Sequence, residues 1–231
     1  SVPQVMVATR KGNTAVRAGD KLAGMRVIPL VIDGAVLDEA DAAAAAAPGE
    51  GPLCEVVPFK LRRVGIVTTG SEVAGGLIED SFTPVVQAKL AAFGIEMVAH
   101  ELPGDDTDDI VAAIGRVREA GVDLVVCTGG MSVDPDDNTP GAIQRSGAEM
   151  VTYGAPVLPG AMLFVGYYED GTPVLGLPGC VMFAKATILD LVLPRVAAGI
   201  RLTREDVVAY GEGGLCLGCA ECHYPICPFG K

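Results

Sequence analysis

From residue 61 onward, the chain alternates short apolar runs with segments in which apolar residues recur every three to four positions. The runs RRVGIVTTG and VDLVVC have continuously apolar centres, which is typical of strands buried on both faces. By contrast, Ile110, Ile114 and Val117 recur at helical spacing, and Gly121 is placed to end that helix. Repeated strand–helix units of this kind predict an α/β fold, a three-layer α/β/α arrangement around a mixed, mostly parallel sheet.

The later part of this region follows the same pattern. The runs AMLFVGYY and PVLGL flank EDGT, which predicts a hairpin. A last apolar helix is expected from about Val181 to Pro194.

Residues 1–58 differ from the rest of the chain. PQVMVAT and MRVIPLVID predict two short strands, and DEADAAAAAAPGEG predicts a solvated Ala-rich helix or linker. We therefore expect a small β-containing segment at 1–58, an α/β domain at 59–200 and a cysteine-rich tail at 201–231.

Charge narrows the choice of ligand. The 231 residues include 17 Lys and Arg against 29 Asp and Glu, a formal net charge of −12. This balance argues against nucleic-acid binding and against binding to an anionic membrane surface. A small anionic ligand is still compatible with it, because backbone N–H groups bind phosphate without net positive charge. With no transmembrane-length apolar run and no signal-peptide pattern, we expect a cytoplasmic protein.

Four turns rich in glycine and polar residues each follow a predicted strand. They are TTGSE at 68–72, PGDD at 103–106, CTGGMS at 127–132 and LPGC at 177–180. In an open α/β sheet, ligands bind in the crevice outside the carboxyl ends of the strands. The sequence therefore predicts one crevice in which the four turns meet.

The third turn leads into three aspartates, Asp134, Asp136 and Asp137. Carboxylates this close repel one another, so they suit a bound Mg²⁺ or an amino-bearing heterocycle. Asp137 also suits capping of the helix expected at Pro140. Asp105 and Asp106 are ambiguous in the same way, between ligand binding and capping of the 108–120 helix.

The order of four motifs carries a family resemblance. TTGSE, TGGMSVDPDDNTP, PVLPGAMLF and GLPGC resemble the molybdopterin-binding domain of molybdenum-cofactor biosynthesis proteins, over roughly residues 61–198. That family includes molybdopterin molybdotransferases, adenylyltransferases and gephyrin.

The resemblance implies molybdopterin as ligand and assigns residues to it. The implied catalytic carboxylates are Asp105 and Asp137, acting on the pterin or through Mg²⁺. The implied pterin- and phosphate-binding residues are Thr69, Gly70, Ser71, Glu72, Thr128, Gly129, Gly130, Ser132, Asp134, Pro178 and Gly179. Molybdotransferases usually have Lys after Pro-Gly, where this chain has Ala161, and Asn-Pro after Leu-Pro-Gly, where it has Cys180-Val181. Both departures weaken the case for molybdate insertion more than the case for pterin binding.

Three functional hypotheses follow. The first is a pterin-binding protein in cofactor synthesis, maturation or delivery, with transferase activity if it is an enzyme. The others are a non-catalytic carrier or chaperone, and a nucleotide-cleaving hydrolase similar to the competence-damage-inducible family. Expected partners are the pterin, molybdoenzymes or other cofactor-synthesis proteins, and further copies of the chain.

Four cysteines crowd into the tail as C-x2-C-x2-C-x4-C. They are Cys216, Cys219, Cys222 and Cys227, with His223 beside the third. Four soft ligands at this spacing predict a metal site holding either a [4Fe–4S] cluster or Zn²⁺.

Overall fold

The computed structural model describes residues 2–46, 52–132 and 137–231. The chain divides into two compact units, Ser1–Pro58 and Phe59–Lys231. Each unit is described by itself.

The first unit is a two-stranded antiparallel sheet with one helix. Strand β1 (Val5–Thr9) pairs with β2 (Ala23–Val27), and α1 spans Gly34–Ala45. Asp33 begins α1 by accepting a hydrogen bond from the N–H of Ala35 at 3.0 Å. No residue of α1 is buried, as expected for an Ala-rich segment without large apolar side chains. The predicted small β-containing N-terminal segment is confirmed.

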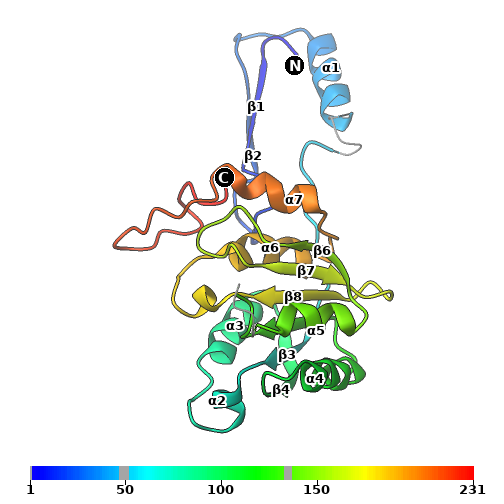
Figure 1. Cartoon of the computed structure of the whole chain (residues 1–231). Helices are drawn as coiled ribbons and strands as arrows, with labels where there is room; N and C mark the ends of the chain where they lie inside the picture. The colour runs from blue at the N-terminus through cyan, green and yellow to red at the C-terminus, as the bar shows by residue number, and fades with distance from the viewer. Residues whose placement is uncertain (1, 47–51, 133–136) are drawn as a thin grey trace. The chain divides into compact units, whose positions relative to one another are not determined.

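The second unit is built on a six-stranded sheet in the order β4-β3-β5-β8-β7-β6 (Figure 1). Every neighbouring pair as far as β8 is parallel, and β7 is antiparallel to both β8 and β6. The predicted mixed, mostly parallel sheet is therefore confirmed. The strands are β3 (Arg63–Thr68), β4 (Glu96–Glu101), β5 (Leu124–Thr128), β6 (Glu149–Tyr153), β7 (Phe164–Tyr167) and β8 (Pro173–Leu177).

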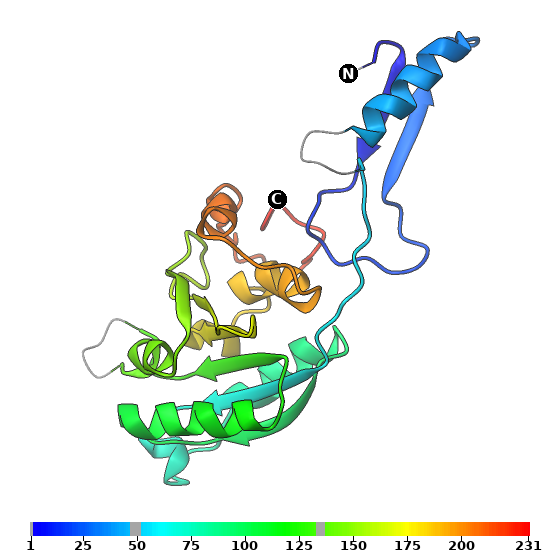
Figure 2. The ribbon, with the colours of Figure 1, turned by 90° about the vertical axis from the view of Figure 1, so that its right-hand side faces the viewer.

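Helices cover both faces of this sheet. Val64 and Ile66 of β3 pack in the same cluster as α3 and α6, whereas Val67 packs in the cluster of α4 and α5. Figure 2 shows α4, in green, lying alongside the strands. The helices are α2 (Ser71–Ala74), α3 (Phe82–Ala91), α4 (Thr107–Glu119), α5 (Thr139–Arg145), α6 (Ile188–Ala197) and α7 (Arg204–Val208). In the described part of the chain, no helix has the length and apolar character needed to span a membrane.

The last long helix begins later than the sequence analysis placed it. A 3₁₀ turn occupies Gly179–Met182, and α6 starts only at Ile188. The reason is a capping box, in which the Thr187 hydroxyl accepts from the N–H of Leu189 while Asp190 accepts from the N–H of Thr187. The expected start at Val181 is wrong because it relied on apolar spacing and overlooked this box.

Gly65 allows α4 to pack closely on β3. A Cβ atom at this position would lie 2.8 Å from Cβ of Val117. We expect Gly65→Ala to lower the free energy of unfolding by about 1–3 kcal/mol, because neither strand nor helix can move away cheaply. Urea denaturation measures this change.

Gly115→Ala, on the helix α4 that packs against Gly65, is the matched control. A Cβ atom there meets nothing within 4 Å in the described structure. We expect it to raise the free energy of unfolding by about 0.5–1 kcal/mol, since Ala favours helix over Gly. Equal effects of the two substitutions would contradict close packing at Gly65.

Candidate functional site

The carboxyl ends of the parallel strands meet at one edge of the sheet. Thr68 of β3 is in register with Thr128 of β5, which is in register with Leu177 of β8. After β3 the chain passes through the short helix α2 to α3 on one face, whereas after β5 it enters α5 on the other. Adjacent strands whose connections diverge in this way form the switch point at which open α/β sheets bind ligands. The crevice between β3 and β5 is therefore the candidate site.

Thr69 joins the two turns of this crevice. Its N–H donates to the carbonyl of Thr128 at 2.8 Å, and its hydroxyl donates to the same carbonyl at 3.2 Å. The hydroxyl of Thr139, at the start of α5, lies 3.1 Å from that of Thr69. Thr69 and Thr139 are both buried. The contact fixes the ends of β3 and β5 and the start of α5 against one another.

Gly129 and Gly130 fill the remaining space in left-handed conformations, with φ of 82° and 51°. A Cβ on Gly129 would lie 2.3 Å from the carbonyl oxygen of Thr69, and one on Gly130 would lie 2.8 Å from Oγ1 of Thr139. In the described residues, neither glycine N–H donates a hydrogen bond to the protein backbone. Two successive N–H groups in a left-handed turn can form an anion-binding nest.

The neighbouring aspartates Asp105 and Asp106 have different roles. Oδ2 of Asp105 accepts from the N–H of Ser71 at 2.8 Å and from its hydroxyl at 2.6 Å. The amide of Asn138 donates to the carbonyl of Asp105 at 2.9 Å. Asp106 instead caps α4, accepting from two N–H groups of its first turn. Asp105 thus connects the turns after β3, β4 and β5, whereas Asp106 caps α4.

Asp137 points toward the crevice from the other side. Its Oδ1 lies 3.7 Å from the position of a Cβ on Gly130. Its Oδ2 is buried without a hydrogen-bond partner among the described residues, as is the hydroxyl of Thr128. Buried polar atoms are normally paired, so two such atoms beside one nest indicate a polar ligand. Asp134 and Asp136 lie outside the described residues.

Tyr153, the last residue of β6, borders the crevice. Its hydroxyl donates to the carbonyl of Ser132 at 3.0 Å and approaches that of Met131 at 3.2 Å. Burial and the charge of Asp137 both raise the pKa of Tyr153, which keeps the hydroxyl protonated. Tyr153 therefore holds the end of the Gly-Gly turn.

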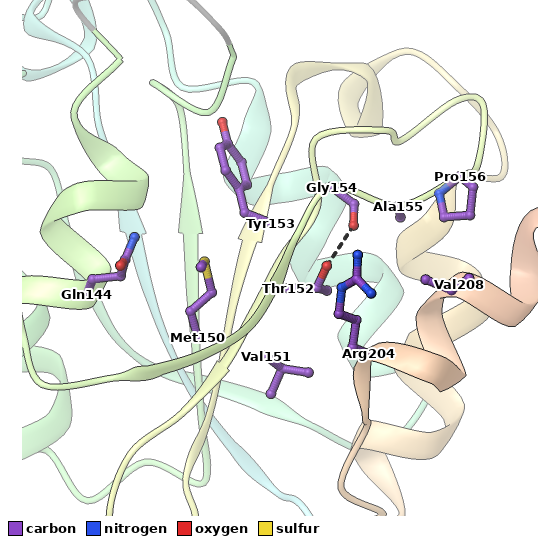
Figure 3. Close-up of a pocket in the computed structure, with 10 residues that line it drawn as sticks. All are labelled: Gln144, Met150, Val151, Thr152, Tyr153, Gly154, Ala155, Pro156, Arg204 and Val208. Atoms are coloured by element: carbon purple, nitrogen blue, oxygen red, sulfur yellow. Dashed lines mark hydrogen bonds between the residues drawn. The ribbon is translucent and has the colours of Figure 1, made fainter.

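An open pocket of about 840 Å³ lies beside Tyr153 (Figure 3). Its wall joins β6, the 154–156 segment and α7. Most of its lining is apolar, and Arg204 and Gln144 bring polar groups to it.

His100 belongs to a polar cluster at the end of β4. Its Nε2 lies 3.5 Å from Oδ2 of Asp80, 3.1 Å from the Thr83 hydroxyl and 3.2 Å from that of Thr68. Oδ1 of Asp80 accepts from the N–H groups of Phe82 and Thr83 at the start of α3. The cluster fixes α3 to β3 and β4 behind the crevice.

This cluster makes stability depend on pH. Burial alone would raise the pKa of Asp80, but hydrogen bonds from Thr83 and Phe82 and the charge of His100 outweigh it and lower the pKa from 3.8. The stabilisation is therefore complete above about pH 4 and is lost as pH falls through the lowered pKa. We expect Asp80→Asn to cost about 1 kcal/mol at pH 7, because the amide oxygen can still cap α3 but an NH2 group replaces the carboxylate oxygen that faces Nε2 of His100.

Thermal unfolding of wild type and Asp80→Asn between pH 7 and pH 3 measures this effect. The two melting curves should converge at the acidic end. Glu169→Gln is the control, since its side chain is exposed and makes no hydrogen bond or ion pair among the described residues. A difference in melting temperature between wild type and Asp80→Asn that stays constant down to pH 3 would contradict a stabilising role of the Asp80 carboxylate.

The other predicted residues of the turns occupy varied environments. Glu72 and Ser132 are exposed at the crevice mouth, and Gly70 begins α2 with φ of 139°. Pro178 is buried, whereas Gly179 is exposed. Burial raises the pKa of Cys180, so its thiol stays protonated near neutral pH.

The tail cysteines line a separate pocket. Cys216 and Cys227 are half-buried, and Cys219 and Cys222 are exposed. In the described ranges, no three His, Cys, Asp or Glu side chains are grouped closely enough to hold a metal ion. The predicted metal site therefore stays a prediction.

Sequence reasoning missed three contributors to the site, Asn138, Tyr153 and the hydroxyl of Thr139. Asn138 and Thr139 lie inside the TGGMSVDPDDNTP motif, so the motif itself could have indicated them. Tyr153 carries no local signal, because only strand pairing brings it beside residue 131.

Comparison with known proteins agrees with this geometry. A family model described as "Probable molybdopterin binding domain" matches residues 65–198. The "CinA-like protein" of Mycobacterium avium is 37% identical over 90 residues, which is 38% of this chain and 21% of that protein. The chain thus spans about a fifth of the length of such curated relatives.

Solved structures share the fold. The protein CinA from Thermoplasma acidophilum matches with a TM-score of 0.50 at 17% identity, over 59% of this chain and 98% of that one. A structure of MogA matches with a TM-score of 0.50 at 22% identity, over 61% and 100%. Since the family model covers more than half of the residues, and both glycine turns of the crevice lie within the match, the chain belongs to the family of probable molybdopterin-binding domains.

Proposed function

We propose that this protein binds molybdopterin in the crevice between β3 and β5 and acts in molybdenum-cofactor synthesis, maturation or delivery. The observation that carries the proposal is the Gly129–Gly130 turn. Two left-handed glycines present N–H groups at a switch point where side chains would fill the space. The terminal phosphate of molybdopterin is the group that fits such a nest.

The pterin would lie next to the phosphate, beside two buried polar atoms that have no hydrogen-bond partner among the described residues. The buried Oδ2 of Asp137 suits an N–H donor of the pterin ring, and the Thr128 hydroxyl suits an acceptor. The proposed walls are completed by Ser132 and Glu72 at the mouth, and by Pro178 and Gly179 in the turn after β8. Mg²⁺ between Asp137 and the phosphate is a further part of the proposal.

In this proposal, Asp105 positions the binding residues. Its carboxylate holds the N–H and the hydroxyl of Ser71, which fixes the turn that follows β3. Loss of the carboxylate would leave Ser71 free to turn away from the phosphate.

The reaction class follows from what the site offers. If the protein is an enzyme, we propose a transferase that adenylylates the pterin or inserts molybdate. Ala161 stands where molybdotransferases usually have Lys, which favours adenylyl transfer or carriage of the pterin over insertion. We also propose that the protein acts in the cytoplasm and forms a homo-oligomer. Its proposed protein partners are other cofactor-synthesis proteins or molybdoenzymes.

A second candidate function rests on the curated relatives, which are CinA-like proteins. A nucleotide-cleaving hydrolase would use the same nest for the phosphate under attack. Asp137 would then accept a proton from the attacking water. The two functions differ in the ligand retained and in whether a phosphate bond breaks.

Substitution of the carboxylates tests the site. We expect Asp137→Asn to weaken molybdopterin binding at least tenfold, because an amide cannot match a carboxylate as acceptor. Asp105→Asn should weaken it by a smaller factor through Ser71. Fluorescence of the pterin, released from the anaerobically isolated complex and oxidised, measures occupancy.

Asp106→Asn is the matched control in the same turn. Asn caps helices as well as Asp does, so both stability and pterin binding should be unchanged. If Asp137→Asn and Asp105→Asn also bind like wild type, the two carboxylates are structural and the proposed binding mode is wrong.

The ligand itself separates the candidate functions. Wild-type protein should retain molybdopterin and should not bind duplex DNA at physiological salt, since its net charge is −12. Incubation with ATP and Mg²⁺ reports adenylylation, added molybdate reports insertion, and a dinucleotide substrate reports hydrolysis. Retention of pterin with no turnover in any arm would identify a carrier. Tight DNA binding without pterin affinity would overturn the proposal.

A further inference from the structure

We infer that Cys216, Cys219, Cys222 and Cys227 together bind one thiophilic metal centre, either Zn²⁺ or a [4Fe–4S] cluster. The inference is independent of the proposed pterin chemistry. It combines the ligand spacing of the sequence with a placement that spacing alone does not give.

The placement is a shared pocket. All four cysteines and His223 line one pocket of about 260 Å³, although they span twelve residues of a segment with little regular structure. The opposite wall is formed by Pro159 and the 184–186 segment. The four thiols thus line one hollow, although in the part of the chain that the structure describes no three of them are grouped closely enough to hold a metal ion as they stand.

Both ends of the tail are fixed to the domain. The N–H of Cys216 donates to the carbonyl of Leu158 at 2.8 Å, and the N–H of Leu158 donates to the carbonyl of Gly214 at 2.8 Å. At the other end, Phe229 is only 3% exposed and lies in the main core cluster. The N–H of Gly230 donates to the carbonyl of Gly213 at 2.9 Å, which closes the loop on itself.

The first and fourth cysteines share this anchoring. Cys216 and Cys227 are half-buried and pack against the core, and the hydroxyl of Tyr224 between them donates to the carbonyl of Asp190 at 2.9 Å. The tail is therefore ordered at its base by apolar contacts.

Residues 217–223, which form the arc between Cys216 and the anchored end of the tail, are mostly exposed. Cys219 and Cys222 are exposed, and Leu217 is 70% exposed. Exposed cysteines are uncommon, because the thiol is usually buried as a small apolar group. A movement of the arc toward the pocket brings these two sulfurs to the anchored pair, and each thiol gives its proton to solvent as its sulfur binds the metal.

The pocket and the crevice share one segment of the chain. The turn after β8 begins at Pro178 beside β5 and continues to Ala184–Ala186, which line the cysteine pocket. The side chain of Lys89 donates to the carbonyl of Lys185 at 3.1 Å and pairs with Asp190 at 2.6 Å, which secures this segment from α3. A metal centre here would stiffen the 184–186 segment from the other side.

Metal analysis of the 231-residue chain tests the inference. The protein is purified without oxygen, treated with chelator, and reconstituted either with Zn²⁺ alone or with Fe²⁺ and sulfide. We expect about one Zn or about four Fe per chain in one of the two arms, with absorbance near ~400 nm marking the cluster.

The variant Cys219→Ser/Cys222→Ser should lose at least nine-tenths of that metal. Both residues are exposed, so the fold should survive, and circular dichroism checks this. Cys54→Ser is the matched control, because Cys54 is an exposed cysteine outside the motif, and its metal content should equal wild type. Less than a tenth of an equivalent bound in both wild-type arms, or full metal retained by the double variant, would overturn the inference.

Hydrogen exchange gives a second readout that does not depend on stoichiometry. Metal should slow exchange in residues 217–223 and 184–186, while β3 and β5 stay unchanged. Identical exchange in metal-loaded and chelated protein would show that any bound metal lies elsewhere.

Discussion

The contact between Thr69 and the end of β5 is the constraint on which the crevice depends. One side chain and one N–H converge on the carbonyl of Thr128, and the hydroxyl reaches Thr139 as well. Threonine suits this position because its hydroxyl can donate and accept at once. The closeness of the strands leaves no room for a Cβ at residue 129 or 130, so the turn must be Gly-Gly. The Gly-Gly turn is thus a consequence of how two central strands end.

The acidic surroundings of this nest are less repulsive than the sequence suggests. Asp105 is satisfied by Ser71, Asp106 by the first turn of α4, and Asp108 by an ion pair with Arg145 at 2.6 Å. Each of these three carboxylates is held by a neighbouring structural element, whereas Oδ2 of Asp137 has no partner among the described residues. An anionic phosphate can therefore bind in a protein of net charge −12 through short-range N–H groups, because these three charges are already paired or hydrogen-bonded.

Periodicity in the sequence was enough to predict the sheet and its two helical layers. Continuously apolar strands such as β5, in which all five residues are buried, have no polar face and must be covered on both sides. The same reasoning placed the turns on one edge, since parallel strands share a direction. It could not order the strands, and therefore could not bring Tyr153 to the crevice or separate the role of Asp105 from that of Asp106. Those assignments depend on register and on which N–H groups lie within about 3 Å, neither of which is encoded locally.

The late start of α6, at Ile188 instead of the expected Val181, affects the path of the chain after β8. Apolar spacing alone would continue the helix directly from the turn after β8, and the chain would then leave the edge at once. The capping box at Thr187 and Asp190 delays the helix, so that residues 183–185 run along the surface and Phe183 is 82% exposed. Asp190 also holds Lys89 and, through its carbonyl, Tyr224. One aspartate thus caps the helix at its start, holds Lys89, which also secures the 184–186 segment, and accepts the hydrogen bond that attaches Tyr224 of the cysteine tail to the domain.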